Sequence, residues 1–366
     1  MPATPIRFAA SRDGVRLAYV AEGSGPPVVK AAHWLSHIEF DTDSPVWRHW
    51  LRDWAAEHRL WRYDERGCGL SDRAPADLSF ESWVNDLEAV VDASGLERFA
   101  LLGVSQGGAV ALAYAARHPE RVSHLVLYGA YARGRLVRDR SPAAREEADL
   151  MQRLVRLGWG RDNEAFRALF TAQFIPGGTL EQLRWFNELQ RRSATPEDAA
   201  RFLDEFNRLD VTALAAQVRC PTLVLHARDD QRVPFDEGRL LAGLIPHAHF
   251  VPLDSRNHVL LDEPAWPVFM ATVRQFLSAD AHAERSPRPG ASAGDWTPRE
   301  RQVLDLIARG VDNAGIADAL RLSSKTVRNH VSLVYDKLQV HSRGSAVVRA
   351  REIGFGTVSR APQLRG

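Results

Sequence analysis

The chain has 366 residues, 45% of them hydrophobic and 25% charged, with a net charge of +1, as in a soluble globular protein of more than one domain. No apolar run approaches about 18 residues and the N-terminus lacks the apolar core of a signal peptide, so we expect a cytoplasmic protein without a membrane partner. Cys68 and Cys220 lie far apart in sequence, which argues against a disulfide framework or a metal site, and we expect no metal and no cofactor.

Short runs rich in Val and Leu alternate with helical patterns in residues 1–280. Four of these runs are typical of buried strands: 28–31, 100–103, 124–128 and 222–226. Residues 108–118 form a helical pattern that ends before Pro119. Alternation of this kind predicts an α/β domain with a mostly parallel sheet and helices on both faces.

A G-x-S-x-G pattern lies between the second run and that helix: Gly103-Val104-Ser105-Gln106-Gly107. A nucleophilic serine on a tight turn from strand to helix needs glycines two residues before and after it, because larger side chains would crowd the turn. The pattern therefore predicts that Ser105 is a nucleophile. A glycine-rich turn without a catalytic role is the alternative.

Residues 133–210 break the alternation with Arg, Glu, Leu and Phe at helical spacing, and they predict a helical insertion, or cap, over the sheet. We expect the cap to determine which substrate is bound. Its aromatic residues are expected mostly in the core, with some lining an apolar pocket: Trp159, Phe166, Phe170, Trp185 and Phe186.

A serine nucleophile requires a base, and the base requires a carboxylate that orients it. Asp229 and Asp230 follow the strand at 222–226, and His258 lies in a loop before the last helix. Such loops gather at the carboxyl edge of a parallel sheet, and the chain order serine, acid, histidine is the expected one. His258 is therefore the predicted base. The weaker candidates are two histidines just before the last strand, His247 and His249.

Residues 1–280 resemble the α/β-hydrolase superfamily. The resemblance rests on the turn at Ser105, on Asp230 followed by Val233-Pro234, on His258, and on the segment Tyr63-Asp64-Glu65-Arg66-Gly67-Cys68-Gly69-Leu70-Ser71-Asp72. It implies an α/β-hydrolase fold in which Asp230, rather than Asp229, is the acid of a triad with Ser105 and His258. A serine at position 105 also argues against a dehalogenase, which would carry an aspartate there.

Acyl transfer also needs hydrogen-bond donors for the oxyanion that forms. The resemblance assigns this role to the backbone N–H groups of Gln106 and Trp34. The family usually has His-Gly where this chain has Ala32-His33-Trp34, so the shape of this loop is expected to differ. His33 and His37 lie in the same loop and are weak candidates for a catalytic group.

Residues 281–294 contain two prolines, two glycines, two serines and no large apolar side chain, and they predict a flexible, extended linker. The linker separates the domain at 1–280 from a tail at 295–366. The tail carries 12 Lys and Arg against 7 Asp and Glu, a net charge of +5, whereas residues 1–280 carry 33 against 38, a net charge of −5. A basic tail on an acidic body indicates a polyanionic partner.

The tail predicts three short helices. The first begins at Thr297, an N-cap followed by Pro298 and Glu300. The third begins near residues 323–324 and presents a polar and basic face: Lys325, Thr326, Arg328, Asn329 and His330. Two short helices joined by a tight turn, with cations and amides on the second, form a helix-turn-helix that fits the major groove of DNA. A helical module that binds protein is the alternative.

Residues 295–350 resemble the LuxR-type (GerE-like) helix-turn-helix family. The matching segments are Trp296–Arg301, Asn313–Ala317, Ser324–Val331 and Lys337–Arg343. The resemblance implies a small all-α domain that binds double-stranded DNA as a homodimer. Gly315 departs from the family, which commonly has a bulkier helix former at this position.

The two resemblances together predict a transcriptional regulator. Its α/β-hydrolase domain would sense a small acyl ligand and retain serine hydrolase activity on an ester, lactone or related compound. Two alternatives remain open: the chain is primarily a serine hydrolase with an accessory DNA-binding tail, or its hydrolase domain is a catalytically silent ligand sensor.

Overall fold

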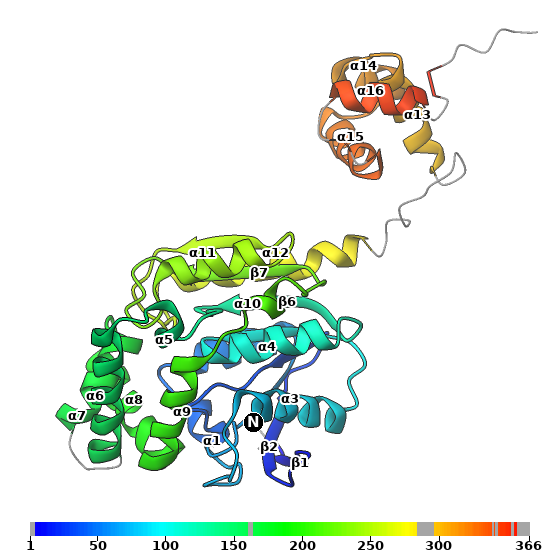
Figure 1. Cartoon of the computed structure of the whole chain (residues 1–366). Coiled ribbons are helices and arrows are strands. Elements are labelled where there is room, and N and C mark those ends of the chain that lie inside the picture. The colour runs from blue at the N-terminus through cyan, green and yellow to red at the C-terminus, as the bar shows by residue number, and fades with distance from the viewer. Residues whose placement is uncertain are drawn as a thin grey trace, which may run out of the picture. The chain divides into compact units, whose positions relative to one another are not determined.

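The computed structural model describes residues 4–159, 164–283, 296–338, 340, 343–352 and 355–356 (Figure 1). The chain divides into two compact units, Met1–Leu277 and Ser278–Gly366. Within the described ranges, no helix is both long enough and apolar enough to span a bilayer.

The first unit is built on a single eight-stranded sheet. Its strands are β1 (Arg7–Ala10), β2 (Arg16–Glu22), β3 (Pro27–Lys30), β4 (Arg59–Tyr63), β5 (Phe99–Val104), β6 (Val122–Tyr128), β7 (Thr222–Ala227) and β8 (His249–Leu253). In space they follow the order β1-β2-β4-β3-β5-β6-β7-β8. The pairings of β2 with β1 and β4 are antiparallel and all others are parallel. The four predicted strands correspond to β3, β5, β6 and β7, and their ends differ from the prediction by no more than two residues.

Helices cover both faces of this sheet. They are α2 (Arg48–Glu57), α3 (Phe80–Ser94), α4 (Gln106–Arg117), α10 (Thr212–Ala215), α11 (Phe235–Leu244) and α12 (Ala265–Ala283). Leu127 of β6 faces α4, where its side chain would lie 3.6 Å from a Cβ at Gly108. Tyr128 points to the opposite face, 5.7 Å between ring centroids from Trp50 of α2 and 5.6 Å from Phe269 of α12. Burial on both faces is the reason why β5, β6 and β7 are almost uninterrupted apolar runs.

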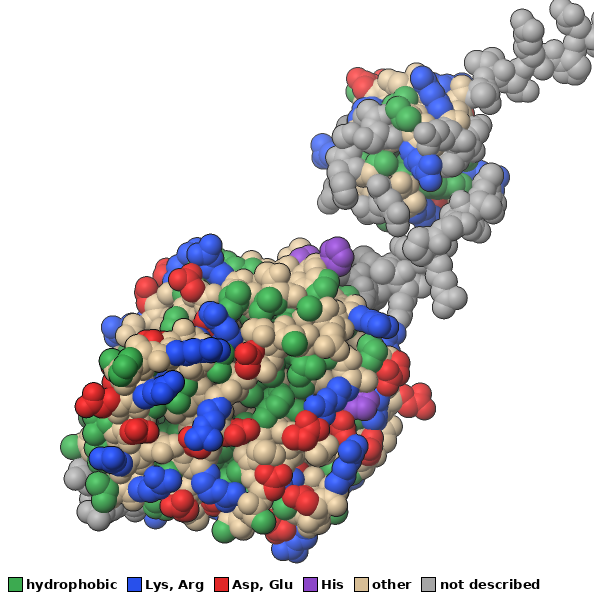
Figure 2. Space-filling model, viewed as in Figure 1, with side chains coloured by type: hydrophobic (Ala, Val, Ile, Leu, Met, Phe, Trp, Pro, Cys, Tyr) green, Lys and Arg blue, Asp and Glu red, His purple; other side chains and the backbone are tan. Residues whose placement is uncertain are grey.

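Charged side chains of both signs are mixed over one face of the first unit (Figure 2). Figure 2 shows acidic and basic side chains interspersed over the face in view. The net charge of −5 in residues 1–280 is therefore not concentrated into a field of one sign on that face.

The predicted cap is present: the described residues of 133–210 contain five helices. They are α5 (Arg135–Arg138), α6 (Pro142–Gly158), α7 (Glu164–Phe174), α8 (Leu180–Ser193) and α9 (Pro196–Arg208). Ser141, Thr179 and Thr195 cap α6, α8 and α9, each accepting a hydrogen bond from a backbone N–H of the first turn. An antiparallel bridge between Arg133 and Asp210 joins the two ends of the cap where it leaves the sheet.

The turn after β4 is fixed by two buried charged residues. Arg66 donates to both carboxylate oxygens of Asp86 at 2.7 and 2.6 Å and also pairs with Asp13 at 2.7 Å. Asp64 accepts hydrogen bonds from the backbone N–H groups of Ile38 and Leu70, at 2.9 and 2.8 Å. The segment that carries the family resemblance at 63–72 therefore ties β4 to α3 and to the loop after β3.

The second unit contains four helices in its described part. They are α13 (Pro298–Ala308), α14 (Asn313–Leu320), α15 (Ser324–Leu338) and α16 (Arg343–Glu352). The first three match the predicted helices, and α16 was not assigned from the sequence. The apolar core includes Val303, Ile307, Ile316, Val327 and Val334, each fully buried. Arg321 adopts a φ of +52° and ends α14, which gives the tight turn before α15.

The expected linker begins later than the sequence suggested. Helix α12 runs to Ala283, three residues into the expected segment 281–294, because the alanines at its end favour a helix. Residues 284–294 of that segment lie outside the described residues.

Candidate active site

Ser105 lies on a strained turn between β5 and α4. Its φ is +54° and its ψ is −127°, a backbone conformation that residues with a side chain rarely adopt. Its backbone N–H donates to Tyr128 of β6 at 2.9 Å. A Cβ at position 107 would lie 2.5 Å from the carbonyl oxygen of Ala32, and one at position 103 would lie 2.6 Å from Gly108 Cα. Glycines are therefore required because the start of α4 presses directly against the turn and the neighbouring loop.

Ser105, His258 and Asp230 are hydrogen bonded in a line. His258 Nε2 lies 2.7 Å from Ser105 Oγ, and His258 Nδ1 lies 2.7 Å from Asp230 Oδ2. The other carboxylate oxygen of Asp230 accepts the backbone N–H groups of Arg232 and Val233, at 2.8 and 2.9 Å. Burial raises the pKa of Asp230, but the charge and hydrogen bond of His258 outweigh burial and hold this pKa below its usual value. Asp230 is thus an ionised group that can orient the imidazole of His258.

The other candidates for the acid and the base lie elsewhere. Asp229 is exposed, and its backbone N–H donates to the carbonyl of Ser255 at 3.1 Å. His247 and His249 are also exposed and lie before or at the start of β8, at the opposite end of that strand from His258. None of these three side chains hydrogen bonds to Ser105, Asp230 or His258.

Buried neighbours hold His258 and Asp230 in place. The carbonyl of Asn257 accepts the hydroxyl of Tyr128 at 2.9 Å, and the Asn257 side chain accepts the backbone N–H of Gly177 in the cap at 2.8 Å. Fully buried His226 contacts the carbonyl of Val233 through Nε2 at 3.1 Å, and the same atom lies 3.5 Å from Asp230 Oδ2. The loop that carries the histidine is thereby anchored to the sheet and to the cap together.

The two predicted oxyanion donors lie beside the serine. Trp34, Ser105 and Gln106 line the same cavity. The backbone N–H groups of Trp34 and Gln106 make no hydrogen bond to another described group, so both can donate to a bound oxygen. The indole of Trp34 packs against the cap, with its ring centroid 5.2 Å from that of Trp159 and 5.5 Å from that of Phe206. The loop that departs from the family pattern is therefore filled by an aromatic contact between sheet and cap.

The two histidines of this loop have structural contacts. His33 is buried, its Nδ1 lies 2.8 Å from the carbonyl of Trp34, and its ring stacks on Trp47. Burial and the nearby Lys30 lower the pKa of His33 well below its usual value, so this ring is neutral. His37 caps α1 (Ile38–Thr42) by accepting the N–H of Phe40 at 3.4 Å. Neither ring hydrogen bonds to Ser105, Asp230 or His258.

Glu65 is a residue of the site that the sequence did not assign. It is buried, and its Oε1 accepts a hydrogen bond of 3.0 Å from the side chain of Gln106, the residue after the nucleophile. Burial raises the pKa of Glu65 to about 8, although Gln106 opposes this. The only feature of the sequence that pointed to Glu65 was its place in the family segment 63–72. The contact with Gln106 arises because the fold brings that segment against the start of α4.

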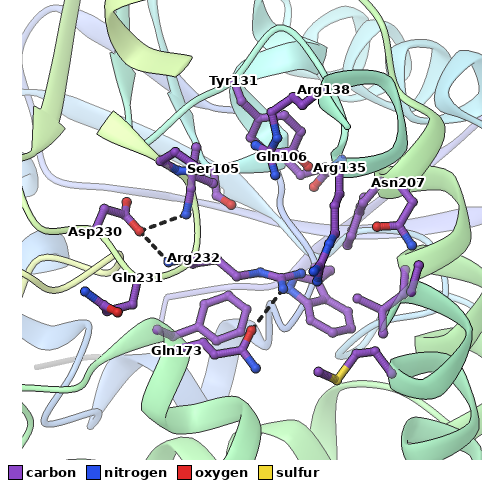
Figure 3. Close-up of a pocket in the computed structure, with 18 residues that line it drawn as sticks. Ser105, Gln106, Tyr131, Arg135, Arg138, Gln173, Asn207, Asp230, Gln231 and Arg232 are labelled. Carbon is purple, nitrogen blue, oxygen red and sulfur yellow. Dashed lines mark hydrogen bonds between the residues drawn. The ribbon is translucent and has the colours of Figure 1, made fainter. Parts of the chain in front are cut away.

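A cavity of about 310 Å³ opens beside Ser105 between the sheet and the cap (Figure 3). Its apolar wall includes Trp34, Met151, Phe174, Leu203 and Phe206. Its polar wall includes Arg135, Arg138 and Arg232, which the sequence did not single out. Five aromatic residues were predicted for core or pocket. Of these, Trp159, Phe170 and Phe186 are fully buried, and Phe186 lines a smaller cavity that also reaches Ser105 and His258.

The predicted DNA-binding face lies on α15. Val327 and Val331 of this helix are buried in the core, whereas Arg328 is exposed. Thr326 donates its backbone N–H to Ser323 Oγ at 3.1 Å, which caps the helix, and His330 is half-buried. The side chains of Lys325 and Asn329 lie outside the described part of the structure. Of the residues predicted to contact DNA, Arg328 is the one whose described side chain is exposed to solvent.

Among the described residues, no group of three His, Cys, Asp or Glu side chains is arranged to hold a metal ion. Cys68 and Cys220 are both buried and unpaired. Burial raises the pKa of Cys68 well above its usual value, so this thiol is not a nucleophile at neutral pH.

Comparison with known families agrees with this geometry. Residues 40–264 match the family described as "alpha/beta hydrolase fold". The chain belongs to this family. Residues 296–350 match "Bacterial regulatory proteins, luxR family", so the same chain carries a LuxR-type DNA-binding domain. Both family resemblances seen in the sequence, and the predicted fold class, are confirmed.

Several of the similar proteins are named as hydrolases or esterases. A 2-hydroxymuconate semialdehyde hydrolase of Pseudomonas sp. (strain CF600) is 31% identical over 290 residues, which cover 71% of this chain and 87% of that protein. A putative carbamate hydrolase RutD of Klebsiella pneumoniae (strain 342) is 29% identical over 220 residues, covering 57% and 79%. The crystal structure of the esterase RhEst1 from Rhodococcus sp. ECU1013 is 26% identical, with a TM-score of 0.61 and coverage of 75% of this chain and 98% of that one.

Proposed function

We propose that this protein is a transcriptional regulator whose hydrolase domain binds and hydrolyses a small acyl compound, an ester, a lactone or a related molecule. The observation that carries the proposal is the line of hydrogen bonds from Ser105 through His258 to Asp230, beside the cavity between the sheet and the cap. The DNA-binding domain in the same chain supports the regulatory part of the proposal.

The proposed reaction is acyl transfer to serine. His258 Nε2 accepts the proton of Ser105 Oγ as this oxygen attacks the carbonyl carbon of the substrate. Asp230 holds the proton on Nδ1 and stabilises the imidazolium that forms. The negative charge on the substrate oxygen is stabilised by the backbone N–H groups of Trp34 and Gln106. His258 then protonates the leaving alkoxide, and a water molecule, activated by the same histidine, releases the acid from Ser105.

Hydrolysis in a DNA-binding protein has a regulatory consequence. A bound acyl compound changes DNA binding only if it binds one conformation of the protein better than another. A compound that is also hydrolysed gives a signal that ends when the compound is consumed. We propose that two copies of the chain bind double-stranded DNA together, in keeping with the LuxR-type domain.

The test compares wild type with Ser105→Ala, using a fluorophosphonate probe and a panel of short p-nitrophenyl esters. Wild type should be labelled and active, whereas Ser105→Ala should lose the label and about 10³-fold or more of kcat. Ser94→Ala, at the end of α3, is the matched control and should behave as wild type. Equal labelling of wild type and Ser105→Ala would contradict the proposal. It would favour the alternative that the hydrolase domain is a ligand sensor that does not hydrolyse its ligand.

A further inference from the structure

The cavity beside Ser105 carries more positive than negative charge on its lining. Three arginines line it, Arg135, Arg138 and Arg232, whereas Asp230 is the sole carboxylate among its lining residues. The carboxylate of Asp230 is already occupied by His258 and by two backbone N–H groups. The charge of the three guanidinium groups is therefore not balanced by the triad.

Arg232 is held in the cavity without an acidic partner. Its guanidinium lies over the ring of Phe174, 5.2 Å from the centroid, and donates one hydrogen bond of 3.2 Å to Gln173 Oε1. No carboxylate of the described residues lies within ion-pair distance of this guanidinium. Of its five N–H donors, most remain available to a bound molecule.

Arg138 lines the same cavity and is also without an ion pair among the described residues. Its guanidinium lies 5.9 Å from the centroid of the Tyr131 ring, and no described carboxylate forms an ion pair with it. Glu237, whose negative charge acts on Arg138, is engaged in an ion pair of 2.6 Å with Arg133. Arg135 differs, because it pairs with Glu147. Two guanidinium groups, Arg138 and Arg232, are thus left without a counter-ion among the described residues.

These cations also act on one another. Figure 3 shows the side chains of Arg135 and Arg232 extending toward the same part of the cavity. Burial lowers the pKa of Arg232, and the positive charges of Arg138 and Arg135 lower it further, although Tyr131 and Asp230 oppose this. Burial and the charge of Arg135 likewise lower the pKa of Arg138. Such a cluster is destabilised while the cavity holds no anion and is stabilised by one.

We propose that Arg138 and Arg232, with Arg135 beside them, form an anion subsite, and that the acyl substrate of this protein carries a carboxylate. This inference rests on the proposed function, since it names the substrate class of the same site. A planar guanidinium binds a carboxylate through two parallel hydrogen bonds. The apolar wall of the cavity fits the carbon chain between that carboxylate and the carbonyl at Ser105, so the substrate is a half-ester or a lactone acid.

The test uses two esters that differ in this charge and in one methyl group. They are mono-p-nitrophenyl glutarate, which has a free carboxylate, and its methyl ester, which is neutral. Wild type should have a kcat/KM about tenfold or more higher for the anionic ester. Arg232→Gln and Arg138→Gln should each lower the ratio of anionic to neutral kcat/KM by about tenfold, because each removes a charged hydrogen-bond donor. Arg232→Gln keeps the backbone N–H that Asp230 accepts.

The control is Arg153→Gln, a substitution of an exposed arginine on α6 that does not line the cavity. Its ratio should equal that of wild type. A wild-type ratio of one or less, or a ratio that both cavity variants leave unchanged, would overturn the anion subsite.

A binding measurement separates this inference from the proposed hydrolysis. Calorimetry with Ser105→Ala should show monomethyl glutarate binding at least tenfold more tightly than dimethyl glutarate. Tighter binding of the monoester, with no hydrolysis of either p-nitrophenyl ester by wild type, would retain the subsite and reject the hydrolase. Equal binding of the two glutarates would reject the subsite, whatever the activity.

Discussion

At the level of single residues, the chemistry of Ser105 depends on buried polar groups behind it. Glu65 contacts the side chain of Gln106, whose backbone N–H is the proposed oxyanion donor. Glu65 Oε2 and Gln106 Oε1 are both buried and have no hydrogen-bond partner among the described residues. A carboxyl group in such a place is favoured in its protonated form, because ionisation would leave a charge without compensation.

Glu65→Gln should therefore change how stability depends on pH. The pKa of Glu65 is about 8 in the folded protein and 4.5 for an ordinary glutamate. Folding thus favours the protonated form, and this contribution is complete below about pH 4.5 and is lost as the pH rises through 8. The melting temperature of wild type should fall relative to that of Glu65→Gln between pH 5 and pH 9. Melting curves of both proteins at intervals of one pH unit measure this. A difference in melting temperature that does not change with pH would contradict a buried, protonated Glu65.

At the level of elements, Arg66 and Asp86 join the turn after β4 to helix α3. Both side chains are 1% exposed, and two hydrogen bonds connect them. Glu81 and Arg117 form a contrasting pair, since they join α3 to α4 at the surface with side chains 58% and 33% exposed. Removing one partner of a buried ion pair lowers the free energy of unfolding far more than removing one partner of an exposed pair.

Asp86→Ala should lower the free energy of unfolding by about 3 kcal/mol, because it leaves Arg66 buried with only the partly exposed Asp13 as a partner. Glu81→Ala, on the same helix, should cost less than about 1 kcal/mol. Urea unfolding followed by tryptophan fluorescence reports on the first unit, since Trp296 is the single tryptophan outside it. Similar losses for the two variants would show that Arg66 finds another counter-ion.

At the level of the whole molecule, each of the two units has an apolar core of its own. The first unit encloses the cavity beside Ser105, and the second packs α13, α14, α15 and α16 around its own apolar centre. The capping box of Thr297 and Glu300 and the ion pair of Glu300 with Lys337, at 2.6 Å, fix α13 against α15. This packing buries Val327 and Val331 of α15 and leaves Arg328 exposed.

Binding of the full chain to double-stranded DNA should weaken steeply as salt rises, because contacts to phosphates release counter-ions. Arg328→Ala should weaken binding and reduce the slope of log K against log salt by about 1. Arg309→Ala is the matched control, since Arg309 pairs with Asp305 on α13. Fluorescence anisotropy with a labelled duplex at four salt concentrations measures both. Binding that does not depend on salt would favour a tail that binds protein.

The sequence by itself determined the local features of this protein. Patterns within about twenty residues predicted several elements, because hydrophobic periodicity, glycine and capping residues act over that range. These elements are the strands β3, β5, β6 and β7, the turn at Ser105, the helices of the cap and the helices α13 to α15. The sequence also predicted that Ser105, Asp230 and His258 lie close together, because loops after parallel strands meet at one edge of the sheet. The choice of Asp230 over Asp229 came from a family resemblance.

Only the tertiary structure decided which distant side chains meet. Glu65 reaches Gln106 because the turn after β4 packs beneath α4, and no local pattern reports a contact across 41 positions. Arg135 and Arg138 of the cap join Arg232 of the loop after β7 in one cavity, although each reads in the sequence as an ordinary surface arginine. Burial then changes their chemistry, since charges that water would screen now act on one another and on whatever molecule the cavity holds.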